Sequence, residues 1–231
     1  MCASQLPISA GSLYRQMLMS EEPIMLDEYA ELFRQGESWF VYLFALSDCS
    51  AFKVGFSCNP LQRIYSFSHR YFERFDLGQS LILQRNDCTD ARAAEAALKA
   101  ELGAFRMDSP PWVPCEAGGR TEWFSAVYFG NAEERLRSFL PGHDAAQLAS
   151  MSDFIRRELV RLSSSFELWV WRQAQYVCDG WASASRARAQ IDAAGSLRDW
   201  LDAYRYFDVP LFVDDPAVLQ FVRDCARRTS A

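Results

Sequence analysis

One acidic residue stands inside an otherwise apolar helix pattern. Residues 89–105 are predicted to form a helix whose apolar residues recur on one side: Ala91, Ala94, Leu98, Leu102 and Phe105. At about 100° per residue, Glu95 projects inside or at the edge of that stripe. A carboxylate there costs free energy unless it is paired, hydrogen-bonded or bound to a cation. Glu95 is therefore the first candidate for chemistry, whereas Lys99 and Glu101 project further out and are expected to be solvated.

A second set of candidate residues lies on a predicted β-hairpin. Residues 39–46 are aromatic and β-branched without polar alternation, which is typical of a strand covered on both faces. A four-residue turn leads into a second strand over residues 51–56. In a regular hairpin Tyr42 faces Gly55, and Lys53 shares their face of the sheet. Gly55 weakens the strand but leaves space over the Tyr42 ring.

A short helix follows the hairpin. Asn59 is a favourable N-cap and Pro60 a favourable first helical residue. Arg63 lies about one turn in, away from the apolar stripe of this helix. Arg70 and Arg74 extend the same basic stripe.

The rest of the chain is predicted to be mainly helical, with two further strands. A third strand is expected over residues 79–84, a loop over 107–120, and a fourth strand over 121–129 with Trp123 and Phe124 in the core. Thr89 is the expected cap of the helix that carries Glu95. A helical arm is expected over residues 1–38. Beyond residue 130 the pattern predicts helices over 132–140, 152–162, 165–178, 181–194 and 216–227, with a strand-like segment at 209–213.

Composition excludes several classes of protein. The 231 residues are 50% apolar and 23% charged, enough for one large or two small folded domains. The longest apolar run has eight residues, too short to span a bilayer, and no signal peptide is visible, so a cytoplasmic protein is expected. Seven cysteines without CxxC spacing indicate reduced thiols. Residues 36–130 hold nine Lys and Arg against eleven Asp and Glu, so bulk charge does not indicate a nucleic-acid partner.

The order of these motifs resembles the GIY-YIG endonuclease superfamily, in the divergent branch found in phage proteins and fungal meiotically up-regulated proteins. The resemblance covers residues 39–130 and rests on a set of motifs in the family's order: Val41-Tyr42-Leu43-Phe44, Phe52-Lys53-Val54-Gly55-Phe56-Ser57, Asn59-Pro60, Arg63, Glu95 and Glu122-Trp123-Phe124. It implies an α+β fold, with a small antiparallel sheet flanked by helices and additional helical N- and C-terminal regions.

The resemblance also implies roles for individual residues. Tyr42 would lie beside the attacking water, Arg63 would bind the scissile phosphate, and Glu95 would hold one divalent ion, Mg²⁺ or Mn²⁺. Lys53 would contact phosphate or lower the pKa of Tyr42. The expected catalytic residues are therefore Tyr42, Lys53, Arg63 and Glu95, and the expected substrate-binding residues are Gly55, Ser57, Arg70 and Glu122.

Four positions depart from the family pattern. Phe40 stands where glycine is common, and Lys53 where many members have tyrosine. Lys99 stands where a histidine often follows the metal-binding glutamate in this branch. The late asparagine of the family has no clear counterpart, and Glu122 is the nearest polar residue.

Three functions remain open at this stage. The first is a metal-dependent DNA endonuclease domain at residues 39–130, with a helical arm at 1–38 and a mainly helical domain at 131–231 for substrate or protein partners. The second is a catalytically inactive module of the same fold that binds DNA or a protein. The third is an interaction protein that uses an exposed aromatic patch: Trp169, Trp171, Tyr176 and Trp181.

Overall fold

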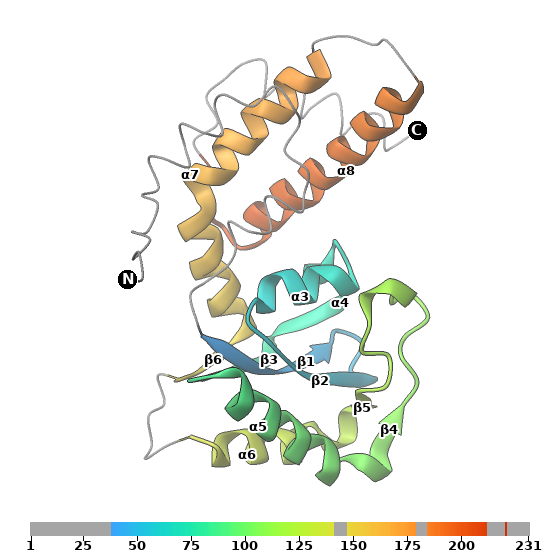
Figure 1. The fold of residues 1–231 in the computed structure, drawn as a ribbon, viewed down its shortest axis with the longest axis vertical. Helices are drawn as coiled ribbons and strands as arrows, with labels where there is room; N and C mark the ends of the chain where they lie inside the picture. Colours follow the sequence, from blue (N-terminus) through green and yellow to red (C-terminus); the bar gives the residue numbers. More distant parts are fainter. Residues whose placement is uncertain (1–37, 141–146, 179–183, 212–219, 221–231) are drawn as a thin grey trace, which may run out of the picture.

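The computed structural model describes residues 38–140, 147–178, 184–211 and 220, and shows a sheet with helices on both faces (Figure 1). The predicted N-terminal arm lies outside the described residues, except for residue 38. The predicted helix over 216–227 lies outside them as well, except for residue 220. Within the described ranges, no helix is long and apolar enough to cross a membrane.

The sheet has six antiparallel strands in the order β4-β5-β2-β1-β3-β6. Its central hairpin consists of β1 (Trp39–Leu46) and β2 (Ala51–Ser57), with Tyr42 opposite Gly55 and Phe44 opposite Lys53, as predicted. The other strands are β3 (Phe75–Arg85), β4 (Arg106–Met107), β5 (Trp123–Ser125) and β6 (Leu148–Ser150). The predicted α+β class with an antiparallel sheet is thus confirmed.

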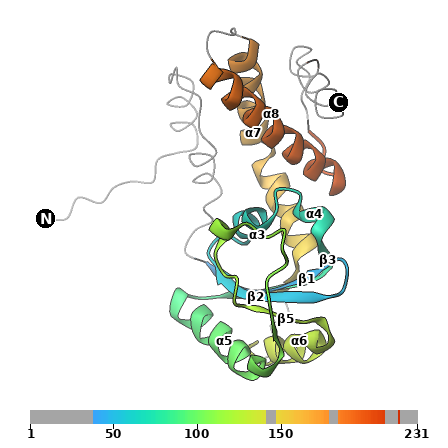
Figure 2. The same ribbon diagram turned by 90° about the vertical axis from the view of Figure 1, so that its right-hand side faces the viewer.

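Helices cover the two faces of the sheet (Figures 1 and 2). One face packs against α3 (Pro60–Phe67), α4 (Tyr71–Arg74) and α7 (Met151–Cys178), and α8 (Ala184–Tyr206) packs in turn on α7. The other packs against α5 (Cys88–Glu101) and α6 (Phe129–Ser138). The described part of the chain also contains three short 3₁₀ turns: η1 (Gly103–Phe105), η2 (Cys115–Ala117) and η3 (Ala126–Tyr128).

The apolar run of β1 explains why both faces need helices. Phe40, Tyr42 and Phe44 enter the core beneath α3 and α7, while Val41 and Leu43 enter the core over α5. Each large side chain that is fully buried contributes about 1.5–3 kcal/mol through the hydrophobic effect. A strand without polar alternation therefore lies at the centre of the sheet rather than at its edge.

The structure corrects the predicted ends of α5 and β5. Asp87, not Thr89, caps α5, since its carboxylate accepts a hydrogen bond from the backbone N–H of Asp90 at 2.8 Å. The strand predicted over 121–129 is wrong beyond Ser125, because the chain turns there into η3 and α6. Phe129 is buried on α6 against Phe52 of β2, so its apolar character reflects helix packing.

The structure also changes other predicted boundaries of strands and helices. β3 begins at Phe75 rather than Gln79, and α7 is one helix where two were predicted. Residues 209–211 are not a strand, and the rest of the predicted segment lies outside the described residues. Of the helix predicted over 181–194, the residues from Ala184 onward are described and helical, and α8 continues to Tyr206.

The predicted domain division at residue 130 stays a prediction, but two elements beyond it belong to the sheet layers. α6 packs against α5 and β1 in the second core. β6, which was not predicted, pairs with the free edge of β3 through Leu81, Ile82 and Leu83. The antiparallel sheet therefore recruits residues up to Ser150 before the long helices begin.

Gly55 should be required for the central hairpin, because a Cβ there would lie 2.2 Å from the Tyr42 hydroxyl oxygen. We expect Gly55→Ala to lower the free energy of unfolding by about 1–3 kcal/mol, as overpacked cores do. Gly78→Ala in β3 is the matched control, since its Cβ would make only an ordinary 3.5 Å contact with Asp76. Chemical denaturation of both variants measures the difference, and equal stability of the two would contradict this packing.

Candidate functional site at the edge of the hairpin

β2 is longer than β5, and this difference leaves part of the hairpin edge open. β5 pairs with Ala51, Phe52 and Lys53, and the last backbone hydrogen bond runs from Val54 N to Glu122 O at 3.1 Å. From Gly55 onward, β2 pairs with β1 alone in the described sheet. α3 lies over one face of this edge and α5 over the other (Figure 2). Side chains from both layers can therefore meet there.

Arg63 and Tyr42 form the first half of the site. The Asn59 side chain accepts a hydrogen bond from Gln62 N at 3.0 Å, which fixes the start of α3 and places Arg63 in its first turn. Arg63 Nε donates to the Tyr42 hydroxyl at 3.3 Å, and its guanidinium lies over the Phe67 ring, 4.5 Å from the ring centre. Arg63 Nη1 also donates to the carbonyl of Ala117.

Burial sets the protonation state of Tyr42. Tyr42 is enclosed in the core, and its burial raises the pKa of its hydroxyl to about 12, although the charge and hydrogen bond of Arg63 act to lower it. Glu95 and Glu122 contribute to the increase through their negative charge. The Tyr42 hydroxyl is therefore protonated at neutral pH. The tyrosine can donate a hydrogen bond, but it is a poor proton acceptor.

Lys53 and Glu122 form the second half of the site. Lys53 is 1% exposed, and its ammonium donates to Glu122 Oε2 at 2.9 Å and to Val54 O at 3.3 Å. Burial lowers the pKa of Lys53 to about 8, while the hydrogen bond and charge of Glu122 oppose this shift. Burial acts to raise the pKa of Glu122, but the hydrogen bond from Lys53 and the surrounding cations hold it below its ordinary value.

Glu95 reaches the same cluster from the opposite layer. It is 7% exposed, as its place in the apolar stripe predicts. Lys99 Nζ lies 3.0 Å from Glu95 Oε2 and 3.8 Å from Glu122 Oε1. Lys99 was expected to be solvated, but its side chain is only 25% exposed, because its ammonium lies between two carboxylates. A helical projection shows only neighbours on the same helix. It could not show that Lys99 also lies near Glu122, which comes from a distant part of the sequence.

The loop before β5 closes over these groups. Gly118 and Gly119 have φ angles of +66° and +64°, a conformation that favours glycine. A Cβ on Gly119 would lie 2.7 Å from Arg63 Nη2, 2.9 Å from Glu122 Oε2 and 3.0 Å from Lys53 Nζ. The adjacent glycines predicted a loop, but nothing in the sequence indicated that its backbone contacts the charged cluster.

Most of the predicted site residues therefore meet. Tyr42, Lys53, Arg63, Glu95 and Glu122 interact directly or through their charges. With Lys99 the cluster contains three cations and two carboxylates. Tyr42, Lys53 and Glu95 are buried, whereas Arg63, Lys99 and Glu122 are partly exposed and connect the cluster to solvent.

Two other predicted residues have structural contacts. The Ser57 hydroxyl accepts a hydrogen bond from Asn59 N at 2.9 Å, in the turn that leads into α3. Gly55 supplies the space that the Tyr42 ring occupies. Both residues thus shape the backbone and the tyrosine that form the site.

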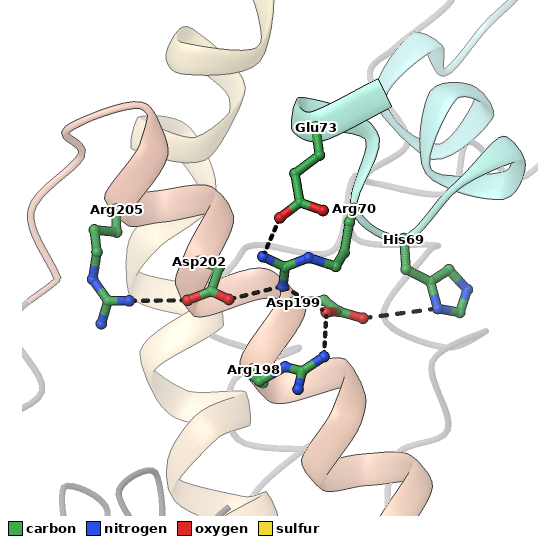
Figure 3. Close-up of polar contacts among 7 residues, drawn as sticks. All are labelled: His69, Arg70, Glu73, Arg198, Asp199, Asp202 and Arg205. Atoms are coloured by element: carbon green, nitrogen blue, oxygen red, sulfur yellow. Dashed lines mark hydrogen bonds and ion pairs between the residues drawn. The ribbon is translucent and has the colours of Figure 1, made fainter. Parts of the chain in front are cut away.

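Arg70, predicted to bind substrate, lies in a separate ion-pair network (Figure 3). Its guanidinium donates to Glu73 at 2.6 Å and, on α8, to Asp202 at 2.8 Å and Asp199 at 3.2 Å. Trp200 of α8 stacks on Tyr65 beside this network. In this structure Arg70 therefore joins α8 to the layer that carries Arg63.

The proposed aromatic interaction patch is contradicted at Trp169. That side chain is 4% exposed and stacks on Phe166 in the core between the long helices. The side chains of Trp171 and Tyr176, and residue Trp181, lie outside the described part of the chain. Trp169 is buried in the core, so it cannot form the exposed surface that the third function requires.

The whole cluster falls within the residues that match one family model. Residues 40–140 match the family model of the T5orf172 domain, which spans β1 to α6 and includes every residue of the cluster. This domain family is associated with nucleases, so the match supports a nuclease-like module that interacts with nucleic acid. No curated protein and no solved structure matches the chain significantly.

The buried ammonium of Lys53 should titrate near pH 8 in the metal-free protein. Nitrogen-detected NMR of labelled lysine side chains measures this value directly. Glu122→Gln should lower the pKa of Lys53 further, because the hydrogen bond and the negative charge of Glu122 both favour the ammonium. A pKa near 10.5 for Lys53 in the wild type, or a higher pKa for Lys53 in Glu122→Gln than in the wild type, would contradict the burial described above.

The same shift makes stability depend on pH in a defined direction. The pKa of Lys53 is lower in the folded than in the unfolded protein, so between about pH 8 and 10 the unfolded state binds more protons. The free energy of unfolding of the wild type, relative to Lys53→Met, should therefore rise across this window. Urea titrations at intervals of pH measure it, and a constant or falling difference would contradict the lowered pKa.

Proposed function

We propose that residues 40–140 form a GIY-YIG-type endonuclease domain that hydrolyses phosphodiester bonds in DNA with one divalent ion, Mg²⁺ or Mn²⁺. The observation that supports this most strongly is the meeting of Tyr42, Lys53, Arg63 and Glu95 at one edge of the central hairpin. These residues come from both layers and from separate motifs. Packing of an ordinary core does not require two carboxylates and three cations at such a place.

The donor groups at this edge fit the proposed ion. Glu95 supplies a buried carboxylate, and Mg²⁺ and Mn²⁺ prefer oxygen ligands and need few from the protein. A positive charge already lies 3.0 Å from this carboxylate, in the ammonium of Lys99. Glu95 would hold the ion, which when bound acidifies a water and offsets negative charge on the phosphate.

The protein side chains then have separate tasks. Arg63 presents a guanidinium for two phosphate oxygens, and its hydrogen bond to Ala117 O must be exchanged for the phosphate. Lys53 adds a second positive charge, which Glu122 holds in place. Tyr42, protonated at neutral pH, orients the attacking water or a phosphate oxygen by donating a hydrogen bond.

We also propose a cellular compartment for this domain and a role for the long helices. The free thiols of Cys49, Cys58, Cys88 and Cys115 agree with a reducing cytoplasm. The helices α7 and α8 project beyond the sheet (Figure 1) and would contact DNA or a protein partner. The ion pairs of Arg70 with Asp199 and Asp202 hold α8 against the layer that carries Arg63.

A second function is favoured by the ion pairs themselves. Both carboxylates are already paired with lysines, and the Tyr42 hydroxyl, with a pKa of about 12, is a poor proton acceptor. Such a site suits a catalytically inactive module that binds DNA or a protein partner. This alternative predicts retention of DNA that weakens with salt, without cleavage in any divalent ion.

Glu95→Gln should abolish DNA cleavage while preserving the fold. The substitution keeps the shape of the side chain but removes its charge, and we expect the cleavage rate to fall by about 10²–10⁴-fold. Single-turnover cleavage of a labelled duplex in Mg²⁺ or Mn²⁺ measures the rate, and filter binding measures DNA affinity, which should change little.

The matched control is Glu101→Gln on the same helix. Glu101 is exposed and pairs with Arg135 of α6, away from the cluster. Its variant should cleave at the wild-type rate. If Glu95→Gln also retained that rate, Glu95 would not be the metal ligand and the proposed mechanism would be wrong.

A further inference from the structure

Lys99 bridges two carboxylates that come from distant parts of the chain. Glu95 lies one turn earlier on α5, and Glu122 immediately precedes β5. The ammonium of Lys99 lies 3.0 Å from the first and 3.8 Å from the second. Side chains of opposite charge on one helix face are common at this spacing. The contact with Glu122 is different, because it places a cation between the two oxygen donors nearest to the proposed metal position.

The three cations of the cluster differ in how firmly they are held. Lys53 is 1% exposed and donates to both Glu122 and a backbone carbonyl. Arg63 is held by Tyr42, Phe67 and Ala117. The side chain of Lys99 is 25% exposed and lies in the last turn of α5. Its four-carbon chain can swing into solvent, where its own charge is hydrated, but the buried carboxylate of Glu95 then needs another cation in its place.

We propose that Lys99 is an internal competitor of the divalent ion. In the metal-free protein its ammonium holds Glu95 and Glu122 together, and it withdraws into solvent when the two carboxylates bind metal. Glu122 is then a second oxygen ligand beside Glu95. This inference rests on the proposed function, because it assumes that the ion binds at Glu95.

Electrostatics give the direction of the effect. An ammonium and a divalent ion cannot both lie between the same two carboxylates, because their mutual repulsion is strong at such distances. Metal binding must therefore include the free energy of displacing Lys99. Removal of this charge should tighten metal binding, whereas a lysine that serves only to join α5 to β5 would, when removed, leave the affinity unchanged or lower it.

The test is Mn²⁺ binding to the full chain at neutral pH without DNA, measured by calorimetry after treatment with a chelator. Lys99→Met should bind Mn²⁺ about tenfold more tightly than the wild type or better. Lys99→Gln is a second neutral variant and should behave alike, whereas Lys99→Arg keeps the charge and should show no gain. Glu95→Gln in the Lys99→Met background should remove the tight site.

Arg92→Met is the matched control for a general change in charge. Arg92 lies on α5 one turn before Glu95, and its exposed guanidinium lies over the Phe56 ring, 5.7 Å from the ring centre. Its removal should change Mn²⁺ affinity far less than removal of Lys99. An equal gain in Arg92→Met would show that net charge alone sets the affinity, and would overturn the proposal.

The remaining outcomes separate this inference from the proposed function. If neither neutral Lys99 variant binds Mn²⁺ more tightly than the wild type, or if no variant binds it, the competition does not exist. If the neutral variants bind more tightly and Glu95→Gln abolishes the gain, the inference holds even when no variant cleaves DNA. In that case the nuclease proposal alone fails.

Discussion

The burial of the Lys53 ammonium is the constraint on which the site depends. An ammonium in a protein core is costly unless a carboxylate accepts its charge, and here Glu122 does so at 2.9 Å. This pairing ties the start of β5 to the centre of β2. It also limits the length of β5. The chain turns at Gly118 and Gly119, and Glu122 then reaches Lys53 immediately before β5 begins at Trp123. The open edge of the hairpin follows from this arrangement.

That open edge lets two layers contribute to one cluster. Tyr42 and Arg63 lie on the α3 side, while Glu95 and Lys99 come from α5 on the other side. Had β5 continued along β2, its backbone would have separated the two groups. Gly55 also contributes to the cluster, because the Tyr42 ring occupies the space that a side chain at position 55 would fill. Charge balance and backbone geometry therefore support each other at the site.

Much of this arrangement could be predicted from local patterns. The hairpin register, with Tyr42 opposite Gly55, followed from the length of the turn, and the α3 cap followed from Asn59-Pro60. The burial of Glu95 followed from helical periodicity. The contact of Lys99 with Glu122 could not be predicted, because it joins residues whose distance depends on where β5 begins. β6 was missed since three residues at a sheet edge carry little periodicity, and the aromatic run up to Phe129 has the same composition in a strand as in a buried helix start.

We propose that this charged cluster serves phosphodiester hydrolysis. The most direct measurement is the nicking of supercoiled plasmid by the full chain in Mg²⁺ or Mn²⁺, with an excess of chelator as the reference. If the cluster has this role, supercoiled DNA should be converted to open-circular DNA in the presence of either ion, and the conversion should be lost in chelator. Retention of the plasmid without any nicking, in either ion, would contradict this role and leave a nucleic-acid-binding module on the same fold.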